Sequence, residues 1–167
     1  MKHLVADTGP LLHLQEAGAL DLLGLVGKVS ITRLIMDELR LHITDIWQDG
    51  MPEWIRIADL SEDASRRANI WIHEEKLHLG EAQVLALARE TRADWFLTDD
   101  AAARRIAEDI GMETRGSIGV ILWAAAHRMI EKSRAQACFT GLENSSLWMS
   151  QKVRSEARIA LARLFQS

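Results

Sequence analysis

Short apolar segments alternate with longer amphipathic ones over the first 115 residues of the chain. The short segments have the apolar runs or the period-two alternation that are typical of buried strands. They predict strands at Lys2–Ala6, Lys28–Ile31, Trp54–Ala58 and Asp94–Leu97, and a weaker strand at Met112–Arg115.

The longer segments carry apolar residues three and four positions apart, which indicates helices with one buried face. The predicted helices are Leu11–Gln15, Ala19–Leu25, Thr32–His42, Glu62–His73, Gly80–Arg92 and Ala101–Ile110. After Gly116 the pattern stays helical almost to the end of the chain. The helices predicted there are Ser117–Ile130, Arg134–Thr140 and Ser146–Phe165.

Strands that alternate with helices pair in parallel, and right-handed crossovers place the helices on both faces of the sheet. We therefore predict an α/β fold: a three-layer α/β/α sandwich with a central, mainly parallel sheet of four to five strands and a helical C-terminal tail. The length of 167 residues suits one domain, and no repeat or linker divides it. We expect a single domain over residues 1–167, with a core at about 1–130 and a helical extension at 131–167.

Composition excludes several classes of protein. The hydrophobic content of 48% and the charged content of 26% are ordinary for a globular protein, not for a disordered or fibrous one. The one cysteine, Cys138, excludes an internal disulfide and a cysteine-ligated zinc site. The chain has neither an apolar stretch of membrane-spanning length nor the pattern of a secretory signal, so the expected location is the cytoplasm.

The formal net charge of −4 is distributed unevenly. Residues 1–100 hold 10 Lys and Arg against 18 Asp and Glu, whereas residues 101–167 hold 10 against 6. An acidic half beside a basic half indicates a reaction site with a phosphate-binding flank, although scattered solvated charges give the same balance. The candidate flank is Arg104, Arg105, Arg115, Arg128, Lys132 and Arg134.

Three acidic residues directly follow predicted strands. Asp7 follows the first strand within the segment VADTG, and Asp99 and Asp100 follow the strand that ends in FLT. In open parallel sheets the working crevice lies at the carboxyl ends of the strands. These carboxylates are therefore expected at one edge of the sheet.

Two further acids fall on the apolar faces of predicted helices. Glu38 lies on the stripe of the helix at Thr32–His42, and Glu81 lies one turn before the stripe of the helix at Gly80–Arg92. The stripes are Ile31, Leu34, Ile35 and His42 in the first helix, and Val84, Leu85 and Ala88 in the second. A carboxylate on an inward face needs a partner, because burying an unpaired charge is very costly.

Each acid also has a purely structural interpretation. Asp7 and either Asp99 or Asp100 suit the cap positions of the helices that follow them. Glu81 suits the first turn of its helix, and Glu38 would keep its carboxylate in water at the edge of its stripe. As a set, however, clustered carboxylates repel one another and need a cation. An all-oxygen pocket suits Mg²⁺ or Mn²⁺, which activate water for phosphodiester hydrolysis.

These segments resemble the PIN-domain ribonucleases, metal-dependent nucleases with a small α/β/α fold. The resemblance rests on four segments in the order of the family: VADTG, MDEL, LGEAQVLALA and FLTDD. It covers residues 3 to about 110, and the segment RGSIGVILWAAAHRMI extends it to about residue 130. This last segment is similar to the PIN proteins of bacterial and archaeal toxin–antitoxin-like loci.

The resemblance implies which side chains do the chemistry. The implied catalytic and metal-binding carboxylates are Asp7, Glu38, Glu81 and Asp100. Thr8 and Thr98 are the implied supporting hydroxyls, and Asp99 stays open as an alternative metal ligand because its helical phase also turns it inward. Glu81 stands where many relatives have Asp, and its additional methylene would shift a bound ion.

The implied activity is that of a Mg²⁺- or Mn²⁺-dependent endoribonuclease, the toxin of a toxin–antitoxin pair. An open crevice beside a short basic strip favours single-stranded RNA, with Arg104, Arg105 and Arg115 as phosphate contacts. The implied partners are an antitoxin-like protein and a second copy of the chain. The alternative is a catalytically inactive PIN-fold module that binds protein or RNA, but the presence of all four acids favours the enzyme.

Six histidines and six tryptophans are not assigned to the predicted site. The histidines lack the spacing of a metal site, which favours surface or supporting roles. Trp123 and Trp148 lie on helical patterns, which favours a core or interface role over the stacking of bases.

Overall fold

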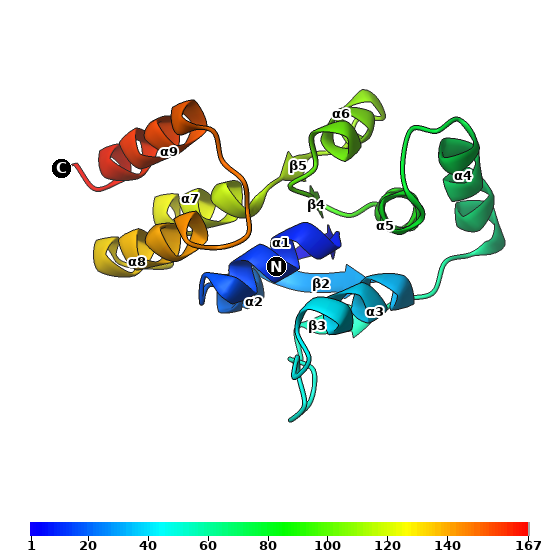
Figure 1. Cartoon of the computed structure of the whole chain (residues 1–167), viewed down its shortest axis with the longest axis horizontal. Coiled ribbons are helices and arrows are strands. Elements are labelled where there is room, and N and C mark those ends of the chain that lie inside the picture. The colour runs from blue at the N-terminus through cyan, green and yellow to red at the C-terminus, as the bar shows by residue number, and fades with distance from the viewer. Residues whose placement is uncertain (167) are drawn as a thin grey trace.

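The computed structural model describes residues 1–166. The strands within these residues form one sheet (Figure 1). The strands are β1 (Lys2–Ala6), β2 (Gly27–Ile31), β3 (Ile55–Ile57), β4 (Trp95–Leu97) and β5 (Thr114–Arg115). Their order across the sheet is β3-β2-β1-β4-β5, and every neighbouring pair is parallel. The predicted α/β fold is confirmed.

Helices connect the strands and cover the sheet. They are α1 (Thr8–Glu16), α2 (Asp21–Val26), α3 (Arg33–His42), α4 (Glu62–His73), α5 (Leu79–Glu90), α6 (Ala101–Asp109), α7 (Ser117–Ala126), α8 (Lys132–Glu143) and α9 (Gln151–Leu164). Hydroxyl side chains determine where three of them begin. Thr32, Ser61 and Ser150 each accept a hydrogen bond from the backbone N–H three residues later, at the starts of α3, α4 and α9.

Two of the C-terminal helices are shorter than predicted. α7 ends at Ala126 instead of continuing to residue 130, because the chain turns at Arg128, whose φ is 57°. α9 begins at Gln151 instead of residue 146, because Ser150 caps it. The connection between α8 and α9 therefore runs from residue 144 to residue 150, and its irregular last part, 147–150, matters for the site described below.

The middle of the sheet is apolar on both faces. The side chains of Leu4, Val5 and Phe96 in β1 and β4 are fully buried, as expected for central parallel strands. Right-handed crossovers place α1, α2 and α3 on one face and α4, α5 and α6 on the other. α5 packs directly against β1 and β4, and α4 packs against α5.

The C-terminal helices form a separate apolar cluster. α7 packs against α8 and α9 around Ala125, Phe139 and Leu161, and it also contacts α1 and α2. In Figure 1 these three helices lie at the opposite end of the molecule from α4. The predicted helical tail is confirmed. Within residues 1–166, each helix is too short or too polar to cross a bilayer.

The strand order brings two polar residues side by side at the carboxyl edge of the sheet. The chain leaves β1 toward one side of the sheet and leaves β4 toward the other, so a crevice opens between their ends. Ala6 pairs with Leu97 in the register of these strands. The backbone N–H of Asp7 donates to the carbonyl oxygen of Leu97 at 2.9 Å, which places Asp7 beside Thr98.

Candidate functional site

A cleft of about 530 Å³ lies at this edge of the sheet. All five predicted carboxylates line it, although they come from separate parts of the chain. The lining residues are Asp7, Thr8, Gly9, His13, Glu38, His78, Gly80, Glu81, Asp99, Asp100, Leu147 and Trp148. None of these is Lys or Arg among the residues that the structure describes, so the wall of the cleft is strongly acidic.

Asp7 both caps α1 and faces the other acids. It is 8% exposed; its Oδ1 accepts from the N–H of Thr8 at 2.8 Å, and its Oδ2 accepts from the hydroxyl of Thr98 at 3.4 Å. Burial raises the pKa of Asp7 to about 6, and the charges of Glu81 and Glu38 add to this rise, whereas the hydrogen bonds from Thr8 and Thr98 oppose it. Asp7 therefore serves as the helix cap and also lies in the cleft beside the other acids.

Glu38 lies at the margin of the buried face of α3, not in its middle. The buried residues of α3 are Ile35, Met36 and Leu39. The predicted stripe was wrong at His42, which is exposed, because the helix turns Met36 and Leu39 toward the core instead. The hydroxyl of Thr8 donates to the carboxylate of Glu38, so Thr8 connects Glu38 to Asp7.

The first turn of α5 brings two further features to the cleft. Gly80 lies so close to Glu38 that a Cβ on Gly80 would be 2.6 Å from Oε1 of Glu38. Glu81 turns its Oε2 back to the backbone N–H of His78 at 3.1 Å, which stabilises the start of the helix. The missing side chain at Gly80 thus allows the acids of α3 and α5 to approach each other.

The two acids after β4 have different environments. Both oxygens of Asp99 are occupied: the N–H of Ser117 lies at 2.7 Å, its hydroxyl at 2.6 Å, and Nδ1 of His13 at 2.7 Å. Burial by itself raises the pKa of Asp99, but the hydrogen bonds from His13 and Ser117 outweigh it and lower the pKa. Asp100 is exposed, and its Oδ1 caps α6 by accepting from the N–H of Ala103 at 2.8 Å.

Two further polar residues at Asp99, His13 and Ser117, were not predicted from the sequence. His13 lies one helical turn after Gly9 on α1, and a Cβ on Gly9 would be 3.6 Å from both His13 and Asp99. The signal for His13 was its four-residue spacing from Gly9, which places both positions on one face of the helix that follows Asp7. The signal for Ser117 was its place just beyond the carboxyl end of β5.

The oxygen-rich donor set of the cleft fits a hard divalent cation. The raised pKa of Asp7 reflects burial together with the negative charge of its neighbours, and a cation there would offset both. Within residues 1–166, no three Asp, Glu, His or Cys side chains converge closely enough to hold one ion. Binding an ion therefore requires some of these side chains to rotate, and the long side chains of Glu38 and Glu81 allow that.

The predicted phosphate contacts lie beside the cleft, near a groove of about 440 Å³ that adjoins it. Arg104 and Arg115 line the groove, and Arg105 is exposed on α6. Nη2 of Arg104 donates to the carbonyl oxygen of Thr98 at 3.2 Å, whereas Arg115 is paired with Glu113 at 2.6 Å. Arg104 thus links the groove to the edge of the sheet on which the acids lie.

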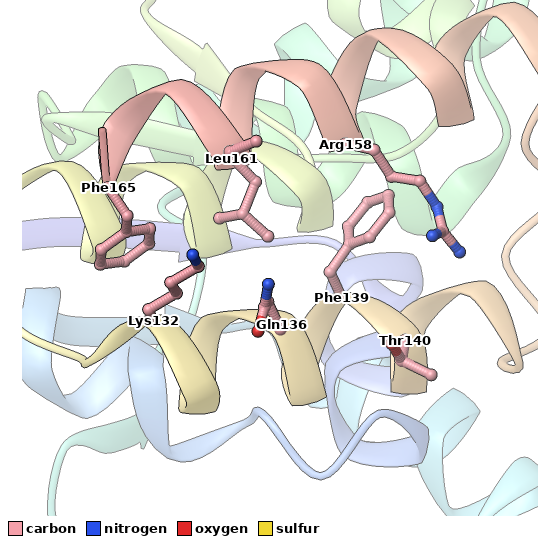
Figure 2. A pocket seen from close by; sticks show the side chains of 8 residues that line it. Lys132, Gln136, Phe139, Thr140, Arg158, Leu161 and Phe165 are labelled. Atoms are coloured by element: carbon pink, nitrogen blue, oxygen red, sulfur yellow. The ribbon is translucent and has the colours of Figure 1, made fainter.

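A cavity of about 280 Å³ between α8 and α9 has a different character (Figure 2). Its lining residues are Lys132, Gln136, Phe139, Thr140, Arg158, Leu161, Ala162 and Phe165. Arg158 is already paired with Glu143 at 2.5 Å and lies over the ring of Phe139. These described lining residues include no Asp, Glu, His or Cys, the usual metal ligands of proteins.

Comparison with known proteins assigns the family. Residues 3–162 match the family model described as DUF3368: PIN domain. No curated protein gives a significant match to the chain. The PIN domain is a nuclease-type fold, generally that of metal-dependent ribonucleases, and the matched range covers both the sheet and the C-terminal helices. The chain therefore belongs to the PIN-domain family.

Proposed function

We propose that this chain is a Mg²⁺- or Mn²⁺-dependent endoribonuclease that hydrolyses single-stranded RNA. The observation that carries the proposal is that five carboxylates line one cleft whose described lining contains no Lys or Arg. We propose that residues 1–167 act as one PIN-like domain. In that domain the extension at 131–167 supplies two residues of the cleft wall, Leu147 and Trp148.

Asp7, Glu38, Glu81 and Asp100 would hold the metal in this proposal. When bound, a divalent ion supplies an activated water and neutralises charge on the phosphoryl oxygens. Asp100 is preferred to Asp99 as the fourth ligand because both oxygens of Asp99 already accept hydrogen bonds, whereas one oxygen of Asp100 is available.

The remaining polar residues would position the acids and the RNA. Thr8 and Thr98 orient the carboxylates of Asp7 and Glu38 through hydrogen bonds. Asp99, at the end of β4, would hold the start of α7 and the side chain of His13 in place through hydrogen bonds. The arginines of the groove would contact backbone phosphates, which position an RNA strand without reading its sequence.

Replacing both Arg104 and Arg105 by Ala should weaken RNA binding about equally for all sequences. The slope of log Kd against log salt should flatten by about 1.4, because two phosphate contacts are lost and each contact to a single strand releases about 0.7 counterion. Fluorescence anisotropy over a range of salt concentrations measures this slope. Arg66→Ala with Arg67→Ala on α4 is the charge-matched control and should leave the slope unchanged. An unchanged slope in the Arg104 and Arg105 variant would place the RNA elsewhere.

Gly80→Ala should weaken Mn²⁺ binding about tenfold or more, since the new methyl group displaces the carboxylate of Glu38. The metal-free protein should remain as stable as the wild type, because alanine favours the helix and only a flexible side chain has to move. Calorimetric titration and thermal melting measure the two effects. Gly119→Ala on α7, where a Cβ meets only Arg115 at 3.4 Å, is the control. Equal Mn²⁺ affinity in the two variants would contradict a role for Glu38.

The decisive experiment for the function is titration with Mn²⁺ followed by an RNA cleavage assay. Saturable Mn²⁺ binding together with metal-dependent cleavage of single-stranded RNA supports the enzyme. A protein that binds RNA but neither binds Mn²⁺ nor cleaves RNA is instead the inactive PIN-fold module. A toxin role in the cytoplasm, an antitoxin-like partner and a homodimer belong to the same proposal, supported by the resemblance of residues 115–130.

A further inference from the structure

Trp148 stands exposed at the border between the carboxylate cleft and the adjoining groove. Its residue surface is 83% exposed, and it lines both hollows, as Asp99 and Leu147 do. The predicted helix over this position was wrong, because the irregular connection before α9 turns the indole outward. An aromatic side chain that is exposed to this extent gains little stability from packing against the protein.

The backbone that carries Trp148 is tied to the rest of the protein on both sides. Glu16 of α1 accepts hydrogen bonds from the N–H of Ser146 at 2.7 Å and from its hydroxyl at 2.6 Å. Leu147 packs against the main core, and Met149 is buried in it. The indole is therefore held on an anchored segment, so stacking on it costs little additional ordering of the chain.

The charges around Trp148 suit a strand that passes from the groove into the cleft. Arg104 lines the groove, and its guanidinium lies over Gly116, where a Cβ would be 2.7 Å from Nη2 of Arg104. Arg104 takes part in none of the ion pairs within residues 1–166. Its positive charge is therefore available to a phosphate. Single-stranded nucleic acids bind where cations contact the phosphates and aromatic rings stack on the bases.

We propose that Trp148 is a stacking platform for one nucleobase of the RNA, next to the phosphate that enters the carboxylate cleft. This inference rests on the proposed function and adds a substrate-binding residue to it. Stacking tolerates any base, because every base has an aromatic face. Trp148 would therefore strengthen the binding of RNA without selecting a sequence.

The test compares the Kd of a labelled single-stranded RNA of about 10 nucleotides for the wild type, Trp148→Ala and Trp148→Phe. EDTA prevents cleavage during the titration. Trp148→Ala should raise Kd about tenfold, which corresponds to about 1.4 kcal/mol, and Trp148→Phe should restore most of the affinity. With an RNA of the same length that lacks its bases, the wild type and Trp148→Ala should bind equally. Ile70→Ala, an exposed apolar residue on α4, is the control.

The cleavage assay with Mn²⁺ gives a second readout. Trp148→Ala should raise KM and leave kcat nearly unchanged, since the acids are untouched. An unchanged Kd and KM in Trp148→Ala, while the wild type still cleaves RNA, would overturn the stacking proposal and leave the proposed function intact. A wild type that neither binds nor cleaves RNA overturns both. A variant that keeps its RNA affinity but loses self-association in sedimentation would assign Trp148 to a protein interface and also overturn the proposal.

Discussion

Asp7→Asn should reduce metal-dependent RNA cleavage by more than about 100-fold, which is the upper end of the effect of groups that only orient a metal ligand. Asn keeps the shape of the side chain and caps a helix about as well as Asp, so α1 should still begin at Thr8. The loss would come from the missing carboxylate charge, which the metal needs. Cleavage of a labelled RNA under single-turnover conditions measures the effect.

The same substitution should stabilise the metal-free protein at neutral pH. The pKa of Asp7 is about 6 in the folded protein against an ordinary value of 3.8, so folding favours the protonated acid. The stability of the wild type should therefore fall as the pH rises from about 4 to about 6, and should stay lower above that range. Asp7→Asn removes this cost, which is at most about 3 kcal/mol. Denaturant titrations at pH 4 and pH 8 should show the gain only at the higher pH.

Adding Mn²⁺ should remove most of the difference in stability between the two proteins. At a 100-fold excess over its dissociation constant, a ligand stabilises the folded state by about 2.7 kcal/mol, and the wild type should gain this amount. Asp7→Asn should gain little. The measurement is a pair of thermal melts with and without Mn²⁺. A variant that still cleaves RNA and still shows the full metal-dependent shift would mean that Asp7 is only a helix cap.

The second large effect is expected for stability at Asp99. Asp99→Ala should destabilise the protein by about 3–5 kcal/mol. The carboxylate of Asp99 accepts three hydrogen bonds, from the N–H and the hydroxyl of Ser117 and from Nδ1 of His13, and the variant leaves these partly buried groups without an acceptor. The pKa of Asp99 is lowered, so its contribution is present above the ordinary value of 3.8 and is lost as the pH falls through the folded-state pKa. The difference in the free energy of unfolding between Asp99→Ala and the wild type should therefore become smaller at acidic pH.

Asp100→Ala is the matched comparison for Asp99→Ala. It should cost only about 1 kcal/mol, the loss of a helix cap, but it should remove Mn²⁺ binding and cleavage. Urea titrations and calorimetry separate the two variants. If Asp99→Ala is stable and loses Mn²⁺, whereas Asp100→Ala keeps it, the fourth ligand is Asp99 and our preference between the two acids is wrong.

The strands and the elements that carry the acids could be predicted from local pattern. The apolar run at β1 matches the predicted strand exactly, and the acid after it was predicted at the carboxyl edge of the sheet. Strand ends in a parallel sheet share one edge, so the positions of Asp7 and Asp100 in the chain already imply their proximity. Glu38 and Glu81 were predicted near the same crevice from helical phase, and both line the cleft.

Only the tertiary structure decided how these acids differ. Local pattern could not show that His13 and Ser117 meet at Asp99, because the three residues lie far apart in the chain and come together only when α1 packs against α7. The helical period gave a wrong position for part of the buried face of α3. It also predicted a helix at Trp148, because periodicity alone does not show that Ser150 caps α9 or that Glu16 holds the preceding loop. The sequence by itself determined which residues could carry the chemistry, since local periodicity places strands, helices and their ends. Long-range packing and burial determined which of those carboxylates remain available to a ligand.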